Sequence, residues 1–150
     1  MLEIKPIQTK EEQREICGLC GVEFIFDCLA YSAKENNVLL GVLQFRILGE
    51  YAVIYDLAYA NAAVTNGKED ADALIIMGKA ALNFIDSCGV KDVIIKTENM
   101  RNKNPHIPDN VKNIFDIIKI LEFLKFKEDS GGVYKLNLDG YFDSPCRRLS

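Results

Sequence analysis

The chain has 150 residues, 49% of them hydrophobic and 27% charged, which predicts one globular domain with its own core and excludes a disordered chain. The formal net charge is −4 and the basic residues are scattered, which argues against nucleic-acid binding. No apolar run reaches the roughly 18 residues of a membrane span, and the charged N-terminus does not resemble a signal peptide. We therefore expect a cytoplasmic protein without a membrane partner, whose five cysteines stay reduced.

The first half of the chain is predicted to form a strand, a short helix and three further strands. Residues 2–8 alternate apolar and polar side chains, as in a half-buried strand. Thr9 and Glu12 form a capping-box signature for a helix that ends near Gly18 or Gly21. Three segments rich in β-branched and aromatic residues follow, separated by turn residues, and predict an antiparallel meander: 22–33, 36–48 and 51–60.

The second half is predicted to alternate helices and strands. Apolar residues at helical spacing indicate a helix over 71–88, which Gly89 ends, and the buried-type strand 91–97 follows. A strand, a helix and a second strand in this order imply a parallel crossover. A further helix is expected from about Asp109 to Leu124, after a polar loop.

Two short segments after this helix, 126–129 and 133–138, are typical of a closing hairpin. The complete order of elements predicts an α/β fold with a mixed sheet of about six to seven strands and helices on both faces. We assign residues 1–138 to this single domain and 139–150 to a C-terminal tail without hydrophobic periodicity.

A polar segment before the helix at 71–88 carries the clearest functional signal. Residues 64–75 read VTNGKEDADALI, and a helix that begins there leaves free backbone N–H groups and the positive end of its dipole for an anion. The segment also carries carboxylates at Glu69, Asp70 and Asp72. Acidic residues in a first helical turn stabilise a helix without any ligand, so a phosphate-binding loop and a self-capped helix are both open interpretations.

The element order and two local segments resemble the GNAT superfamily of N-acyltransferases over residues 2–138. Segment 56–75, DLAYANAAVTNGKEDADALI, is similar to the family's fourth strand and pyrophosphate loop. Segment 121–138, LEFLKFKEDSGGVYKLNL, is similar to its last helix and closing strands. The resemblance implies a mostly antiparallel GNAT sheet that binds acetyl-CoA or another acyl-CoA, with the pantetheine arm in a splay between the fourth and fifth strands. The acceptor would be a small-molecule or peptide amine.

The resemblance also implies individual cofactor contacts: Leu57, Tyr59, Asn66, Gly67, Lys68, Asp70, Ala71 and Asn113. Asn99 is an alternative to Asn113. Asn66 stands where the family has Arg or Gln, and Glu69 stands where it has the first glycine of the motif. Leu121 takes the place of a tyrosine that often acts as general acid, and Lys125 replaces the glycine before Phe126. These differences favour the alternative of a non-catalytic GNAT-fold module that binds a ligand or protein partner without CoA.

Two residues are candidates for acid–base chemistry. A GNAT transfer needs a base for the acceptor amine, and Asp56 is the only carboxylate in the fourth strand. A lone acid in an apolar strand is costly to bury unless it is paired or wet, so Asp56 is either this base or a hydrogen-bonded structural residue. Tyr134 in the closing strand is the candidate general acid. Tyr55 and Tyr59, predicted to share a face with Leu57, either line a cleft or fill the core.

Cys17 and Cys20 form a CxxC pair, a pattern that can hold zinc or exchange disulfides. Zinc normally needs a second pair, and these cysteines end a predicted helix rather than begin one, so we expect neither a metal site nor redox function. His106, in the polar loop, is expected at the surface. An exposed edge strand of such a sheet could pair two subunits, which leaves a homodimer open.

Overall fold

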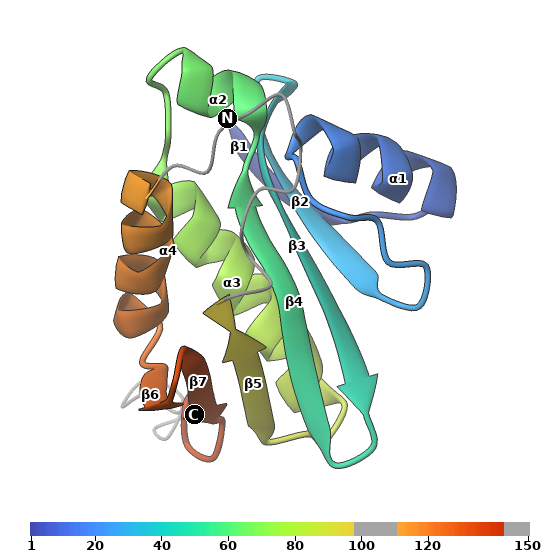
Figure 1. Cartoon of the computed structure of the whole chain (residues 1–150). Coiled ribbons are helices and arrows are strands. Elements are labelled where there is room, and N and C mark those ends of the chain that lie inside the picture. Colours follow the sequence, from blue (N-terminus) through green and yellow to red (C-terminus); the bar gives the residue numbers. More distant parts are fainter. Residues whose placement is uncertain (98–110, 143–150) are drawn as a thin grey trace.

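The computed structural model describes residues 1–97 and 111–142, with side chains of the second range described from Asp116 onward. A seven-stranded sheet has the order β1-β2-β3-β4-β5-β7-β6, in which β4 and β5 run parallel and the other neighbours antiparallel (Figure 1). The strands are β1 (Leu2–Pro6), β2 (Leu29–Glu35), β3 (Val38–Leu48), β4 (Tyr51–Tyr59), β5 (Asp92–Lys96), β6 (Lys127–Ser130) and β7 (Val133–Asn137). The helices are α1 (Lys10–Leu19), α2 (Asn61–Thr65), α3 (Ala71–Ser87) and α4 (Val111–Phe123). The predicted mixed, mostly antiparallel sheet is confirmed.

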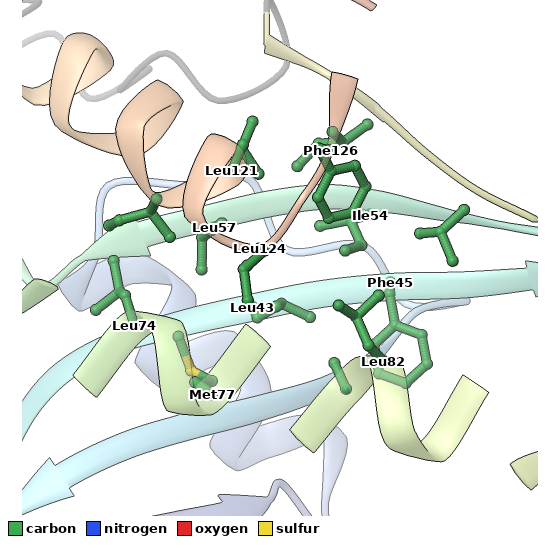
Figure 2. Packing of buried hydrophobic residues seen from close by; sticks show 14 of the residues in the cluster. Leu43, Phe45, Ile54, Leu57, Leu74, Met77, Leu82, Leu121, Leu124 and Phe126 are labelled. Atoms are coloured by element: carbon green, nitrogen blue, oxygen red, sulfur yellow. The ribbon is translucent and has the colours of Figure 1, made fainter. Parts of the chain in front are cut away.

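Helices cover both faces of this sheet. Val42 of β3 packs with Ile16 and Cys17 of α1, whereas its neighbour Leu43 packs in a larger cluster with residues of α3. Successive side chains of a strand point to opposite faces, so α1 and α3 lie on opposite sides of β3. The chain at the end of α4 belongs to the larger cluster, where its leucines meet side chains of α3, β3 and β4 (Figure 2).

A glycine sets the distance between α3 and the chain that follows α4. A Cβ atom at Gly78 would lie 2.8 Å from Cδ1 of Leu124, so a larger side chain on α3 would push this leucine away. Leu124 is completely buried, and it lies close to Leu43 and Leu57 of the sheet (Figure 2). The small residue in α3 therefore lets the end of α4 reach the core.

The four helices just named end in the same backbone motif. The N–H groups of two successive residues after the helix bond back to carbonyls of its last turn. The first of these two residues has a left-handed backbone conformation, with positive φ. That residue is Gly21 after α1, Gly67 after α2, Gly89 after α3 and Lys125 after α4. The predicted stop at Gly89 is confirmed, and Lys125 keeps a glycine-like conformation with φ of 76°.

One predicted strand boundary is wrong. The second strand begins at Leu29, and residues 22–28 form a loop in place of the predicted extension. The side-chain amide of Gln44 in β3 holds this loop, because its Oε1 accepts from the Ile25 N–H (3.1 Å) and its Nε2 donates to the Glu23 carbonyl (2.8 Å). The loop is buried only in part: Val22 and Cys28 are buried, whereas Phe26 is 65% exposed.

Helix α2 is absent from the prediction. It spans five residues and has no side-chain cap, so neither periodicity nor a capping signature marks it. Two predicted local features are confirmed: Thr9 Oγ1 accepts from the Glu12 N–H (3.1 Å) at the start of α1, and a turn separates β2 from β3, formed by Asn36 and Asn37 with positive φ. The first strand, predicted over 2–8, ends at Pro6. The predicted hairpin is β6 and β7.

The start of the predicted tail packs on the domain. The Tyr141 hydroxyl donates to the Leu124 carbonyl (2.9 Å), and the rings of Tyr141 and Phe142 contact the larger core cluster. Residues 143–150 lie outside the described ranges, and the division of the chain at residue 138 stays a prediction. No helix within those ranges is long and apolar enough to cross a bilayer.

Candidate functional site

Strands β4 and β5 separate halfway along β4. They pair from Tyr51 with Asp92 to Ile54 with Ile95, and the remaining residues of β4 have no partner in β5. A β-bulge lies at the same point, because Gln44 of β3 stands opposite Asp56 and the next residue of β3 stands opposite Ile54. Beyond Ile54, one edge of β4 is therefore open toward β5.

A groove of about 350 Å³ lies beside the end of this open edge, between the beginning of α3 and the face of α4. Its lining residues are Tyr59, Glu69, Ala71, Ile75, Asp116, Lys119, Ile120 and Phe123. Ala71 and Ile75 are one turn apart on α3, and the four residues from α4 share one face of that helix. Its volume is at the lower end of the roughly 300–1,000 Å³ of small-molecule pockets. Two predicted cofactor residues, Tyr59 and Ala71, meet in this groove.

The loop before α3 divides into two parts. The N–H groups of Asn66, Gly67 and Lys68 bond to carbonyls of α2, at 3.0, 3.1 and 2.7 Å, because they form the end of that helix. These three amides are therefore occupied within the chain, and the cofactor contacts assigned to Asn66, Gly67 and Lys68 stay predictions. The amides of residues 69–72 have no acceptor within the described ranges, so the free donors lie immediately after the predicted ones.

Asp70 is the N-cap of α3. Its Oδ1 accepts from the Ala73 N–H at 3.3 Å, which supports the interpretation of a self-capped helix at this one donor. The amides of residues 69–72 have no such acceptor among the described residues, which leaves room for the phosphate-binding interpretation, so the two interpretations coexist at one helix start. Lys68, whose side chain is exposed, is the basic residue nearest to this turn in the sequence.

Tyr59 contributes a polar side chain to the wall of the groove. Its side chain is 6% exposed, and its hydroxyl has no hydrogen-bond partner among the described residues. Burial raises the pKa of Tyr59 to about 12, and the charges of Asp116, Glu69, Asp70 and Asp72 add to the effect. The hydroxyl is thus protonated at neutral pH, and carboxylates at the start of α3 and on α4 further disfavour loss of its proton.

Asp56 lies on the opposite face of the sheet, under α1. Its carboxyl group is 4% exposed, and its Oδ2 accepts from Nε2 of Gln44 at 2.7 Å. Oε1 of Gln44 accepts from Nε2 of Gln13 on α1 (2.9 Å), and Oε1 of Gln13 accepts from the Lys10 ammonium (3.1 Å). A chain of two amides therefore runs from a cation at the start of α1 to the carboxylate of β4.

The sequence analysis missed Gln13 and Gln44, although one signal was present. Apart from Gly41, Gln44 is the only residue from Val38 to Phe45 that is not apolar. A polar side chain in such an apolar run is expected to be buried and then needs hydrogen-bond partners.

Tyr134 does not lie with Asp56. It is buried in the larger core cluster with residues of α4, and it pairs with Ile95 of β5. Burial raises the pKa of its hydroxyl, and the charges of Glu128 and Glu122 contribute. Leu57 is also a core side chain, so only its backbone can meet a ligand at the open edge. Because the β-bulge falls at Tyr55, this residue does not share the core face on which Leu57 and Tyr59 lie.

The cysteines of the CxxC pair are buried. Burial raises the pKa of Cys17 to about 12, and that of Cys20 is also raised, which is the opposite of the shift that activates redox thiols. Within the described ranges, no three His, Cys, Asp or Glu side chains are placed to hold a metal ion. Asn99 and His106 lie outside these ranges, as does the side chain of Asn113 in the first turn of α4.

No protein-family model and no curated protein matches the chain. Solved structures do match it over most of its length. The IAA acetyltransferase from Bacillus cereus ATCC 14579 is 15% identical with a TM-score of 0.60, over 87% of this chain and 79% of that one. The ribosomal-protein-S18-alanine N-acetyltransferase from Escherichia coli is 12% identical with a TM-score of 0.60, over 91% and 94%.

A third similar structure, the PaiA N-acetyltransferase from Thermoplasma acidophilum, was solved in complex with coenzyme A. It is 13% identical with a TM-score of 0.57, over 91% of this chain and 99% of that one. At these identities the likeness is one of fold. The chain has the fold of the GNAT acetyltransferases, as segments 56–75 and 121–138 predicted.

Proposed function

We propose that the chain is an acyl-CoA-dependent N-acyltransferase that acts on an amine of a small molecule or peptide. The observation that carries the proposal is the open edge of β4 beyond Ile54, which ends beside a groove and next to the free amides of residues 69–72. An extended acyl-CoA thioester needs a cleft for its pantetheine arm, a cavity along its path and hydrogen-bond donors for its phosphates. The acetyltransferases that share this fold support the same activity class.

The reaction we propose is direct transfer. The acceptor nitrogen attacks the thioester carbon, the C–N bond forms and the C–S bond breaks, with no covalent enzyme intermediate. Backbone N–H groups on the edge of β4 that β5 leaves open beyond Ile54 would polarise the thioester carbonyl. The proton lost by the amine goes to Asp56, directly or through one water, and the leaving thiolate takes a proton from Tyr134.

The positions of these two residues support their roles. Ile95 pairs with Ile54 on one side and with Tyr134 on the other, so Tyr134 stands level with the point where β4 and β5 separate. Asp56 is two residues beyond the last pair, on the face that α1 covers. The base thus approaches the reacting carbonyl from the face of α1, and the acid lies on the face of α4. We place the acceptor amine on the α1 side.

Binding is the first test. A thermal-shift titration with acetyl-CoA, followed by calorimetry, is expected to raise the melting temperature, because a ligand at a hundred times its Kd adds about 2.7 kcal/mol. For a domain of this size that corresponds to roughly 5–10 °C. Turnover of a panel of amines would then be followed by release of the free thiol. No shift at millimolar ligand would refute the proposal in favour of a GNAT-fold module that binds something else.

A matched pair of variants ties binding to the groove. Ala71→Leu adds bulk to the lining at an exposed helical position and is expected to weaken acetyl-CoA at least about tenfold. Ala62→Leu makes the same change on the exposed side of α2 and is expected to leave the affinity unchanged. Equal affinities for the two variants would place the ligand elsewhere.

A further inference from the structure

The groove is unusually acidic for a site that receives a phosphorylated cofactor. Glu69 and Asp116 line the groove, and Asp70 and Asp72 follow Glu69 at the N-cap and in the first turn of α3. Among the lining residues that the structure describes, Lys119 is the only basic one. Coenzyme A carries about four negative charges at neutral pH, counting a pyrophosphate and a phosphate monoester. Phosphates that approach the start of α3 therefore meet like charge.

A second feature of the groove points to a ligand group without charge. Tyr59 lines the groove as a residue that is only 6% exposed, and its hydroxyl, which makes no hydrogen bond among the described residues and keeps access to solvent, can donate to a carbonyl oxygen. The remaining walls are apolar, formed by Ala71, Ile75, Ile120 and the ring of Phe123. A donor hydroxyl in an apolar wall suits an amide-bearing chain such as pantetheine, whereas a phosphate would be held by basic side chains.

On the basis of the proposed function, we infer that this site recognises its acyl donor through the uncharged pantetheine arm, and that the phosphates of the nucleotide oppose binding. The free amides of residues 69–72 offset part of this repulsion, but Asp70 already places a carboxylate over the end of the same helix.

The sign of the salt dependence distinguishes repulsion from attraction. Dissolved salt screens charges, so it weakens a ligand that charge attracts and strengthens a ligand that charge repels. The affinity of an anion site built from basic residues for coenzyme A would fall as the salt concentration rises. The affinity of the acidic groove for coenzyme A is expected to rise.

The experiment is calorimetry on the full chain with four ligands of increasing charge: pantetheine, 4′-phosphopantetheine, dephospho-coenzyme A and coenzyme A. Between about 20 and about 300 mM NaCl, the Kd of coenzyme A is expected to fall at least about threefold, and that of pantetheine to stay constant. Coenzyme A that binds more weakly in high salt would overturn the inference and leave the proposed function intact. Failure of all four ligands to bind would remove the proposed function, and the inference with it.

Charge-neutralising variants provide the second arm. Glu69→Gln and Asp116→Asn are each expected to tighten coenzyme A about threefold and to leave pantetheine unchanged. Glu15→Gln removes the same charge from the exposed side of α1 and serves as the control, with no expected effect. Tyr59→Phe is expected to weaken all four ligands by a similar factor of roughly 3 to 10. Unchanged coenzyme A affinity in both acidic variants would contradict the inference.

Discussion

Replacing Gln44 by methionine tests whether the buried amide chain holds the candidate base and the loop beside it. The Gln44 amide makes four hydrogen bonds, to Asp56, Gln13, the Ile25 N–H and the Glu23 carbonyl, and its side chain is completely buried. Methionine has a similar length and no amide. The variant therefore removes the acceptor of one backbone N–H and a donor from one carboxylate.

The magnitude follows from these two losses. A buried N–H that loses its acceptor costs about 1–3 kcal/mol, and the loss of one hydrogen bond to a charged group costs about 1.5–3 kcal/mol, so the free energy of unfolding is expected to fall by roughly 3–5 kcal/mol. In urea, with a slope of about 2 kcal/mol per molar, the unfolding midpoint would move down by roughly 1.5–2.5 M. Equilibrium unfolding followed by circular dichroism measures this shift.

A surface glutamine provides the control. Gln8 is exposed and makes only a 3.4 Å contact with the Pro6 carbonyl, so Gln8→Met is expected to change stability by less than about 0.5 kcal/mol. A loss of under about 1 kcal/mol in Gln44→Met would refute the reasoning, because the amide chain would then contribute no more than an ordinary surface contact.

Three further predictions concern α3, α4 and Tyr59. Asp70→Ala is expected to lower stability by about 0.5–2 kcal/mol in urea unfolding, because the Ala73 N–H loses its cap, whereas Asp70→Asn keeps the cap and most of the stability. Lys125→Gly is expected to raise stability by about 1 kcal/mol, since glycine adopts φ of 76° without a Cβ penalty; a destabilised variant would contradict this. The folded protein holds the Tyr59 proton that the unfolded chain releases near pH 10, so stability is fully present below pH 10 and falls as the pH rises toward 12. Urea midpoints compared at pH 9 and 11 should fall less in Tyr59→Phe than in the parent chain.

Elements with a strong periodic pattern were predictable from the sequence. The face of α3 repeats over several turns and ends at a glycine, and the strands from Val38 to Leu48 and from Tyr51 to Tyr59 are bounded by turn residues. The loop over 22–28 was not predictable, because the Gln44 side chain binds its backbone and the sequence does not show which distant amide will do so. Local composition favoured a strand there, and a tertiary contact decided the outcome.

The candidate site was predictable only in part. The placement of Tyr59 and Ala71 beside one cavity followed from the resemblance, since both flank the loop before α3. The structural role of Gly67 did not follow from the resemblance. It terminates α2, a helix too short to leave a periodic signal, and its left-handed conformation directs the Lys68 N–H back to Ala63. One glycine serves equally well in a helix end and in a phosphate loop, so the residue type alone does not separate the two roles.

The most direct test of the central claim is to map where an acyl donor binds. In a titration of the ¹⁵N-labelled chain with acetyl-CoA, the account predicts the largest amide shift changes at residues 55–59 of β4 and at residues 69–72. Signals of β1 and of the exposed side of α1 should stay unchanged. Saturable shifts that avoid both segments, or no shifts at millimolar ligand, would contradict the assignment of the open β4 edge and the adjoining groove as the acyl-donor site.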